Sequence, residues 1–371
     1  MIDASQIASE FCELVRIDSL SGEEAAVADA LVAKLQALGL TVERDAAGDA
    51  IGGQCGNIIA RLPATDPAKP TIMLNAHMDT VKPGEGIQPI VEGDIIRTDG
   101  STILGADDKA GIAIILAGVR EIIAAEVPHG DLEVVITIAE EIGLFGALYL
   151  DYARIKSQFA LVFDGGRERG IMTTAAPAAA KLTFTVSGVA AHAGVCPEKG
   201  SNAILAASRA IAAMKLGRLD AETTANIGII QGGAARNIVP DHCRVDGEAR
   251  SHDQAKLTAQ IAHMRECFTR ACGDVPGTSV TVDEESSYKS FNLAADDPLV
   301  VLVSNAARAL GIDPKMEVGG GGSDANVFNA RGIPAIILAT GPADVHTLQE
   351  SVAISKMAES ARWLVETVRQ S

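Results

Sequence analysis

Metal-ligating side chains recur in this sequence where short apolar runs end. Histidine or carboxylate residues stand at such ends, or just beyond them, in five segments: His77 and Asp79 in TIMLNAHMDT, Asp107 and Asp108 in TILGADDKAGIA, Glu140 and Glu141 in VVITIAEEIGLFG, Asp164 in FALVFDGG, and His346 in GPADVHTLQE. Most of these apolar runs predict buried strands, and functional sites of α/β proteins collect at the carboxyl ends of strands. We therefore expect a site at one edge of a sheet.

Two histidines with several carboxylates make a mixed nitrogen and oxygen donor set that suits two zinc ions. Two such ions, about 3.5–4 Å apart, can activate a water molecule and polarise a carbonyl group. Glu140 and Glu141 are adjacent, so at a strand end one could bind metal while the other transfers a proton. Asp79 could hydrogen-bond the second ring nitrogen of His77 and fix its tautomer. Taken singly, each segment also fits a polar turn, a helix N-cap or a loop histidine.

Composition limits the partners of the chain. It has 371 residues, 47% of them apolar, which is enough for two domains with buried cores. A formal charge of −17 disfavours nucleic acid and anionic membrane surfaces. The six cysteines form no C-x-x-C pair and predict reduced thiols. The N-terminus lacks a signal-peptide pattern and the apolar runs are too short to span a bilayer, so we expect a soluble cytoplasmic protein.

The order of the predicted elements indicates two domains. Two helices occupy the first forty residues, and strands then alternate with helices. The stretch TTAAPAAA after Met172 predicts a linker. Beyond it the order strand–helix–strand–strand–helix–strand is that of a ferredoxin-like unit. The α/β pattern then resumes, with a C-terminal helix beginning near Gln349. We predict a discontinuous α/β catalytic domain over 1–175 and 288–371, with a ferredoxin-like domain inserted at 176–287.

Taken in chain order, NAHMDT, LGADDKAGIA, AEEIG and GGGGSDAN followed by His346 resemble the aminoacylase–carboxypeptidase G–peptidase T group of metallopeptidases, and its peptidase T-like branch most closely. The resemblance covers nearly the whole chain. It implies a mixed-sheet zinc-peptidase domain with an inserted lid and dimerisation domain. It also implies two Zn²⁺ ions per chain, with Co²⁺ or Mn²⁺ as alternatives. The substrates would be short peptides that lose their N-terminal residue, as with a tripeptidase-like aminopeptidase.

The resemblance also assigns roles to single residues near the metals. It implies five ligands, the first of them bridging both ions: Asp107, with His77 and Asp164 at one site and Glu141 and His346 at the other. Glu140 would be the general base, and Asp79 would orient His77. The peptide bond after the bridging aspartate is typically cis in this family, which implies a cis Asp107–Asp108 bond.

Further roles fall mostly in the inserted domain. The segment AAHAGVCPEKGSNAI resembles the one whose histidine faces the substrate carbonyl, so His192 is a candidate for stabilising the oxyanion. Asn237 and Arg250 resemble lid residues that bind the substrate carboxylate, a task for which a planar guanidinium is suited. A surface charge on a strand explains Arg250 equally well. The late Gly-rich loop resembles the substrate-facing loop of the family, with contacts from Gly321, Gly322 and Ser323.

Three functions remain open on the sequence alone. The leading one is a two-zinc aminopeptidase acting on tripeptides or other short peptides, for which the resemblance implies a homodimer through the inserted domain. The second is an amidohydrolase of the same fold that acts on N-acyl amino acids or as a carboxypeptidase; it would not recognise a free substrate amine. The third is a metal-binding protein without catalysis. It predicts a lost base or ligand, whereas Glu140 and all five ligand positions are present.

Overall fold

The computed structural model describes residues 1–371, apart from the side chains of residues 286 and 287, and it divides into two compact units. Unit 1 comprises Met1–Ala175, Asn292–Gly319 and Ser323–Ser371, and unit 2 comprises Ala176–Phe291 and Gly320–Gly322. Each unit buries an apolar cluster of its own. Each therefore has the separate core that defines a domain.

A mixed nine-stranded sheet forms the centre of unit 1. Its strands lie in the order β1 (Thr41–Arg44), β2 (Ile58–Leu62), β6 (Leu132–Thr137), β3 (Ile72–His77), β7 (Phe159–Gly165), β18 (Ala335–Ala339), β8 (Ile171–Ala176) and β16 (Phe291–Asn292), while β17 (Lys315–Val318) pairs with β8. A smaller sheet contains β19 (Pro342–Ala343), β20 (Ser351–Ala353), β5 (Ile95–Arg97) and β4 (Ile90–Glu92).

The central strands point the same way, which fixes where their ends lie. β3 is parallel to β6 and β7, and β18 is parallel to β7. Every residue of β3 and β6 is buried, as expected for parallel strands covered on both faces. The carboxyl ends of these four neighbouring strands therefore share one edge of the sheet.

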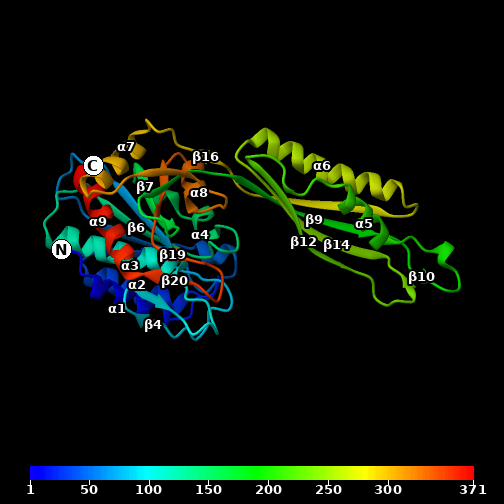
Figure 1. Cartoon of the computed structure of the whole chain (residues 1–371), viewed down its shortest axis with the longest axis horizontal. Helices are drawn as coiled ribbons and strands as arrows, with labels where there is room; N and C mark the ends of the chain where they lie inside the picture. The colour runs from blue at the N-terminus through cyan, green and yellow to red at the C-terminus, as the bar shows by residue number, and fades with distance from the viewer. The chain divides into compact units, whose positions relative to one another are not determined.

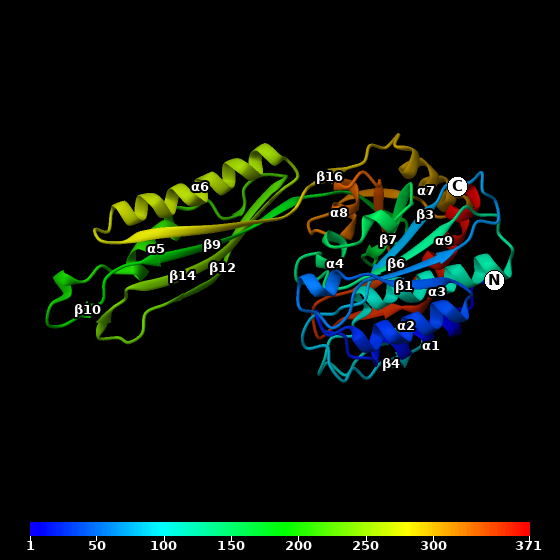
Figure 2. The same ribbon diagram turned by 180° about the vertical axis from the view of Figure 1, so that it is seen from behind.

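Helices cover the sheet of unit 1 (Figures 1 and 2). The helix α3 (Ala106–Ala124) is mostly buried because it lies between β3 and β7 on one side and α1 (Ala4–Val15) and α9 (Ile354–Gln370) on the other. Gly118 permits this close packing, since a Cβ there would lie 2.9 Å from Leu364 of α9. The remaining helices are α2 (Ala25–Ala37), α4 (Phe145–Leu148), α7 (Pro298–Ala309) and α8 (Asp324–Ala330), with 3₁₀ turns η1 (Ala47–Ala50) and η2 (Tyr152–Arg154).

Unit 2 contains a five-stranded antiparallel sheet with two helices, α5 (Ala203–Ala213) and α6 (Gln254–Gly273), packed on it (Figure 2). The strand order is β11 (Gly217–Arg218), β12 (Thr223–Gly232), β14 (His242–Ser251), β9 (Ala178–Ser187) and β15 (Ser279–Tyr288). Along the chain, β9, α5, β12, β14, α6 and β15 follow the predicted β-α-β-β-α-β order. A short ribbon of β10 (Ala191–His192) and β13 (Ile238–Val239), and the turn η3 (Pro197–Lys199), complete the unit.

Two local features differ from the prediction. The stretch TTAAPAAA contains the boundary between the two units, at Ala175 and Ala176, but it forms strands rather than an irregular linker: β8 pairs with β17 and β18, and β9 lies between β14 and β15. The C-terminal helix begins at Ile354 rather than near Gln349, because Ser351–Ala353 form β20 and pair with β5. All six cysteines are free thiols, as predicted. None of the described helices combines the length and apolar character needed to cross a membrane.

Candidate active site

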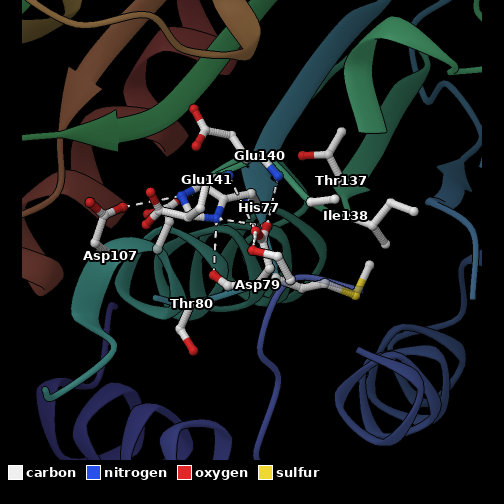
Figure 3. A network of polar contacts seen from close by, with 12 residues as sticks. His77, Asp79, Thr80, Asp107, Thr137, Ile138, Glu140 and Glu141 are labelled. Atoms are coloured by element: carbon white, nitrogen blue, oxygen red, sulfur yellow. Dashed lines mark hydrogen bonds and ion pairs between the residues drawn. The ribbon is translucent and has the colours of Figure 1, made fainter. Parts of the chain in front are cut away.

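Polar side chains gather at the carboxyl edge of the sheet of unit 1 (Figure 3). They come from the ends of three neighbouring strands, the start of α3 and the loop after β19. The structure brings together all five residues predicted to be ligands, which are His77, Asp107, Glu141, Asp164 and His346. The Asp107–Asp108 peptide bond is cis, as the resemblance implied.

The carboxylate of Asp107 lies at the centre of this arrangement. Its Oδ1 is 3.1 Å from His77 Nε2, and its Oδ2 is 3.2 Å from His346 Nε2. His77 Nε2 also lies 3.9 Å from Asp164 Oδ1, and His346 Nε2 lies 2.8 Å from Glu141 Oε1. The five residues thus form two groups that share Asp107, and the ligand atoms of each group lie within 4.8 Å of one another. Each oxygen of Asp107 faces a different histidine, an arrangement suited to a carboxylate between two cations.

The chemistry of both groups fits a divalent metal ion. Each offers one imidazole nitrogen and two carboxylates, a mixed donor set that zinc accepts. Burial acts to lower the pKa of His77, but its hydrogen bonds with Asp107 and Asp79 outweigh burial and raise the pKa well above the usual value. Hydrogen bonds with Asp107 and Glu141 raise the pKa of His346 to about 10. The negative charge that favours a proton on these rings equally favours a cation in its place.

Asp79 is fully buried and holds four neighbouring groups. His77 Nδ1 lies 3.1 Å from the backbone oxygen of Asp79 and 3.3 Å from its Oδ1, which leaves Nε2 facing the ligand cluster. The carboxylate of Asp79 also accepts the backbone N–H groups of Glu140 at 3.0 Å and Glu141 at 3.2 Å, and the Ser21 hydroxyl at 2.7 Å. Asp79 is therefore placed to fix the ring of His77 and the backbone that carries both glutamates.

Glu140 lies beside the two groups but belongs to neither. It is 9% exposed. Burial raises the pKa of Glu140, His77 opposes this shift, and the nearby carboxylates of Asp164 and Asp324 add to it. A carboxyl group outside the ligand set, with a raised pKa, has the properties of a general base that later acts as an acid.

The loops that carry Glu140, Glu141 and His346 use uncommon backbone conformations. Ala139, just before Glu140, has a φ of 48°, and His346 itself has a φ of 61°. Such angles are rare for residues other than glycine and cluster at functional sites. The turn at Ala139 ends the regular course of β6 before Glu140 and Glu141, so their side chains need not follow the alternation of a strand.

The polar residues predicted in the inserted domain lie in two places within unit 2. His192 is exposed in β10, opposite Ile238, and Asn237 is exposed just before β13, with its backbone carbonyl accepting the N–H of Ala193 at 3.0 Å. Arg250 lies near the other end of β14, where it pairs with Ala179. The eight residue steps from position 242 to Arg250 span about 27 Å of strand. The structure therefore brings His192 and Asn237 together but does not bring Arg250 to them.

Other predicted substrate contacts have partners of their own. Glu248 holds the guanidinium of Arg250, with 3.2 Å from Nε to Oε1 and 3.0 Å from Nη2 to Oε2. Gly322 lies against the ring of Tyr288, which leaves no space for a Cβ atom, whereas a Cβ at Gly321 would meet only Arg250 Nη1 at 4.0 Å. Ser323 caps α8 and hydrogen-bonds Asp164. Contacts within the chain are thus sufficient to explain why glycine occupies position 322 and serine occupies position 323, without any contact to a substrate.

Three buried charged residues near the candidate ligands were given no role from the sequence: Lys109, Asp324 and Glu350. Asp324 accepts hydrogen bonds from Thr137 and from Asn75, and burial raises its pKa to about 6. Lys109 donates to the backbone oxygen of Ile17 at 2.8 Å, and burial lowers its pKa to about 7. The available signal for Lys109 was a cation placed directly before the apolar run of α3.

Comparison with known proteins agrees with this geometry. Residues 73–370 match the model of the family described as Peptidase family M20/M25/M40. The uncharacterized protein YqjE of Bacillus subtilis (strain 168) is 40% identical over 371 residues and is covered completely, as is this chain. The crystal structure of aminopeptidase PepT from Bacillus cereus ATCC 10987 has a TM-score of 0.90 and 41% identity, covering 100% of this chain and 99% of that one.

A second solved structure, a tripeptidase from Staphylococcus aureus subsp. aureus Mu50, has a TM-score of 0.94 and 36% identity, covering 100% of this chain and 98% of that one. At these identities the likeness extends beyond the fold to the sequence of the whole chain. The protein therefore belongs to peptidase family M20/M25/M40 and, within it, to the peptidase T-like branch.

Proposed function

We propose that the protein is a dizinc aminopeptidase that removes the N-terminal residue from tripeptides and other short peptides. The observation that carries this proposal is the pair of ligand groups joined through Asp107, with Glu140 beside them and outside both. The choice of substrate is supported by the names of the two similar structures, an aminopeptidase and a tripeptidase.

In this proposal His77 and Asp164 would hold one zinc ion, Glu141 and His346 would hold the other, and Asp107 would contribute to both sites. Zinc ions bound there would make a water molecule more acidic and polarise the scissile carbonyl. Glu140 takes the proton of the attacking water and delivers it to the leaving amine. Asp79 keeps His77 and the backbone of Glu140 in position through the contacts described above.

The substrate class can be tested with the zinc-loaded protein and a library of di-, tri- and tetrapeptides, read by mass spectrometry. We expect loss of one N-terminal residue, with tripeptides among the substrates. The matched controls are the same peptides with an acetylated N-terminus, which should not be cleaved because the free amine is missing. Release of the C-terminal residue, or hydrolysis of N-acyl amino acids, would instead support the amidohydrolase alternative.

We further propose that unit 2 supplies substrate contacts, with His192 stabilising the oxyanion of the tetrahedral intermediate. His192→Ala should then lower kcat by about 10²–10³-fold, the usual effect of losing one oxyanion donor. Metal content should not change, because His192 is in neither ligand group. Steady-state kinetics and metal analysis on the same sample test this, and full activity of the variant would remove His192 from the mechanism.

The position of His192 within unit 2 suggests that it acts on the site of a second copy. An extended tripeptide spans roughly 10 Å, much less than the stretch of β14 between position 242, which follows the β10–β13 ribbon, and Arg250, so one copy of unit 2 cannot place both His192 and Arg250 on one tripeptide. β12 also has a largely open edge. β11 pairs only with Thr224 and Ala225, and Ile229 and Ile230 further along are each 50% exposed. An open strand edge of this kind suits pairing with a second copy.

Mixing two inactive variants separates the two arrangements. In a mixed dimer of Glu140→Ala and His192→Ala chains, one site keeps both residues if His192 acts across the dimer, and neither site does if it acts within its own chain. We therefore expect activity to return on mixing. Absence of activity despite mixed dimers confirmed by native mass spectrometry would place His192 in its own chain.

A further inference from the structure

Glu350 is a buried carboxylate with a specific connection to the ligand loops. It is 1% exposed and lies four residues after His346. Its Oε2 accepts the backbone N–H groups of Leu104 at 2.7 Å and Gly105 at 2.9 Å, and its Oε1 accepts that of Asp107 at 3.1 Å. One side chain from the His346 loop thus binds three amides in the segment that leads into Asp107.

This segment has an unusual backbone and no cap of its own. Gly105 has a φ of 71°, and the N-terminus of α3 lacks a side-chain cap from the preceding residue. The first amides of a helix need acceptors from outside the helix. Glu350 supplies one to Asp107 and two more to the turn before it, so the position of the Asp107 carboxylate depends on a residue far along the chain.

Asp79 and Glu350 make corresponding contacts with the backbone that carries the candidate ligands. Asp79 contacts His77 and binds the amides of Glu140 and Glu141, whereas Glu350 follows His346 and binds the amides leading into Asp107. Burial lowers the pKa of Lys109, but Asp18, Asp79 and Glu350 all act to raise it.

We propose that Glu350 is a positioning residue for the metal centre. It holds Asp107 against the His346 loop before any metal binds, so that the two groups already share Asp107 in the metal-free protein. Without Glu350, the segment 104–107 would have to be ordered when metal binds, and the entropy lost in that step would lower affinity. The proposal rests on the assignment of Asp107 and His346 as ligands under the proposed function.

Zinc affinity measured by competition with a chromophoric chelator tests the proposal directly. Glu350→Ala should weaken zinc binding by about 10- to 100-fold, the range observed when a group that supports a metal ligand is removed. Glu350→Gln should lose less, because its amide oxygen still accepts hydrogen bonds. Wild-type affinity in folded Glu350→Ala would overturn the positioning role.

Glu133 provides a matched control. It is also 1% exposed, and its Oε2 accepts the N–H groups of Lys156 and Ser157 at 3.0 Å each, but it lies at the start of β6, away from the carboxyl edge. Glu133→Ala should lower thermal stability and leave zinc affinity unchanged. If it weakened zinc binding as much as Glu350→Ala, the effect would be general destabilisation, and the proposal would be wrong.

Hydrogen exchange of the wild-type protein gives a second measurement that needs no variant. The amides of Leu104, Gly105 and Asp107 should be protected in the metal-free protein, since Glu350 already binds them. Free exchange that becomes protected only on adding zinc would overturn the proposal. A wild-type protein that binds no zinc would contradict the proposed function instead, so the two failures are distinguishable.

Discussion

Glu140→Ala is expected to retain both metal ions and to lose kcat by about 10²–10⁴-fold, the usual contribution of a general base. Its carboxyl group lies in neither ligand group, so removing it should not affect metal binding. It is buried next to the cluster, so solvent cannot readily substitute for it. Turnover and metal content measured on the same preparation check this, and near-normal kcat in the fully metallated variant would exclude Glu140 as the base.

The adjacent Glu141 is the matched control for this experiment. The two glutamates share their sequence environment, and both backbone N–H groups donate to Asp79. Glu141, however, lies 2.8 Å from His346 Nε2 and belongs to a ligand group. Glu141→Ala should therefore lose metal as well as activity. If the two variants had the same metal content, the division of roles between the glutamates would be wrong.

The sequence predicted the strand-end part of this site for a physical reason. His77 and Asp164 end apolar runs whose burial is continuous, and such runs form neighbouring parallel strands. Neighbouring parallel strands end at the same edge of the sheet. Residues at the ends of these strands therefore lie close together, whatever sequence connects one strand to the next. His346 differs, because a histidine in a loop after a two-residue strand carries no such pattern. Only the resemblance to a known family connected it with the others.

Residues that act through backbone contacts could not be predicted in this way. Glu350 binds the amide of Asp107 across 243 positions of sequence, and its own neighbourhood reads as an ordinary exposed loop. The distance between His192 and Arg250 likewise depends on the register of β14 with β9, which the alternation of side chains does not determine. The stretch TTAAPAAA does join the two units, but it forms strands rather than an irregular segment, because small residues suit a flexible segment and a closely packed strand equally well.

The greatest loss of metal is expected for Asp107→Ala. Asp107 is the one residue common to both groups, with Oδ1 facing His77 and Oδ2 facing His346. Removing it takes a ligand from each group and also removes the negative charge between the two cations, which would then repel one another more strongly. We expect Asp107→Ala to bind neither zinc ion tightly. His77→Ala loses a ligand from one group only and should keep one ion.

Asp108 is the control, since it is adjacent to Asp107 but outside both groups. Its Oδ2 accepts the backbone N–H of His77 at 3.2 Å, and its Oδ1 accepts that of Gly111 at 3.2 Å. Asp108→Asn keeps an acceptor oxygen and should retain two ions, measured by metal analysis after dialysis against a weak chelator. Two tightly bound ions in His77→Ala would refute the assignment of that group. Asp107 is the only residue of the two groups that contacts both histidines. Two tightly bound ions in Asp107→Ala would therefore show that the groups do not depend on a shared carboxylate.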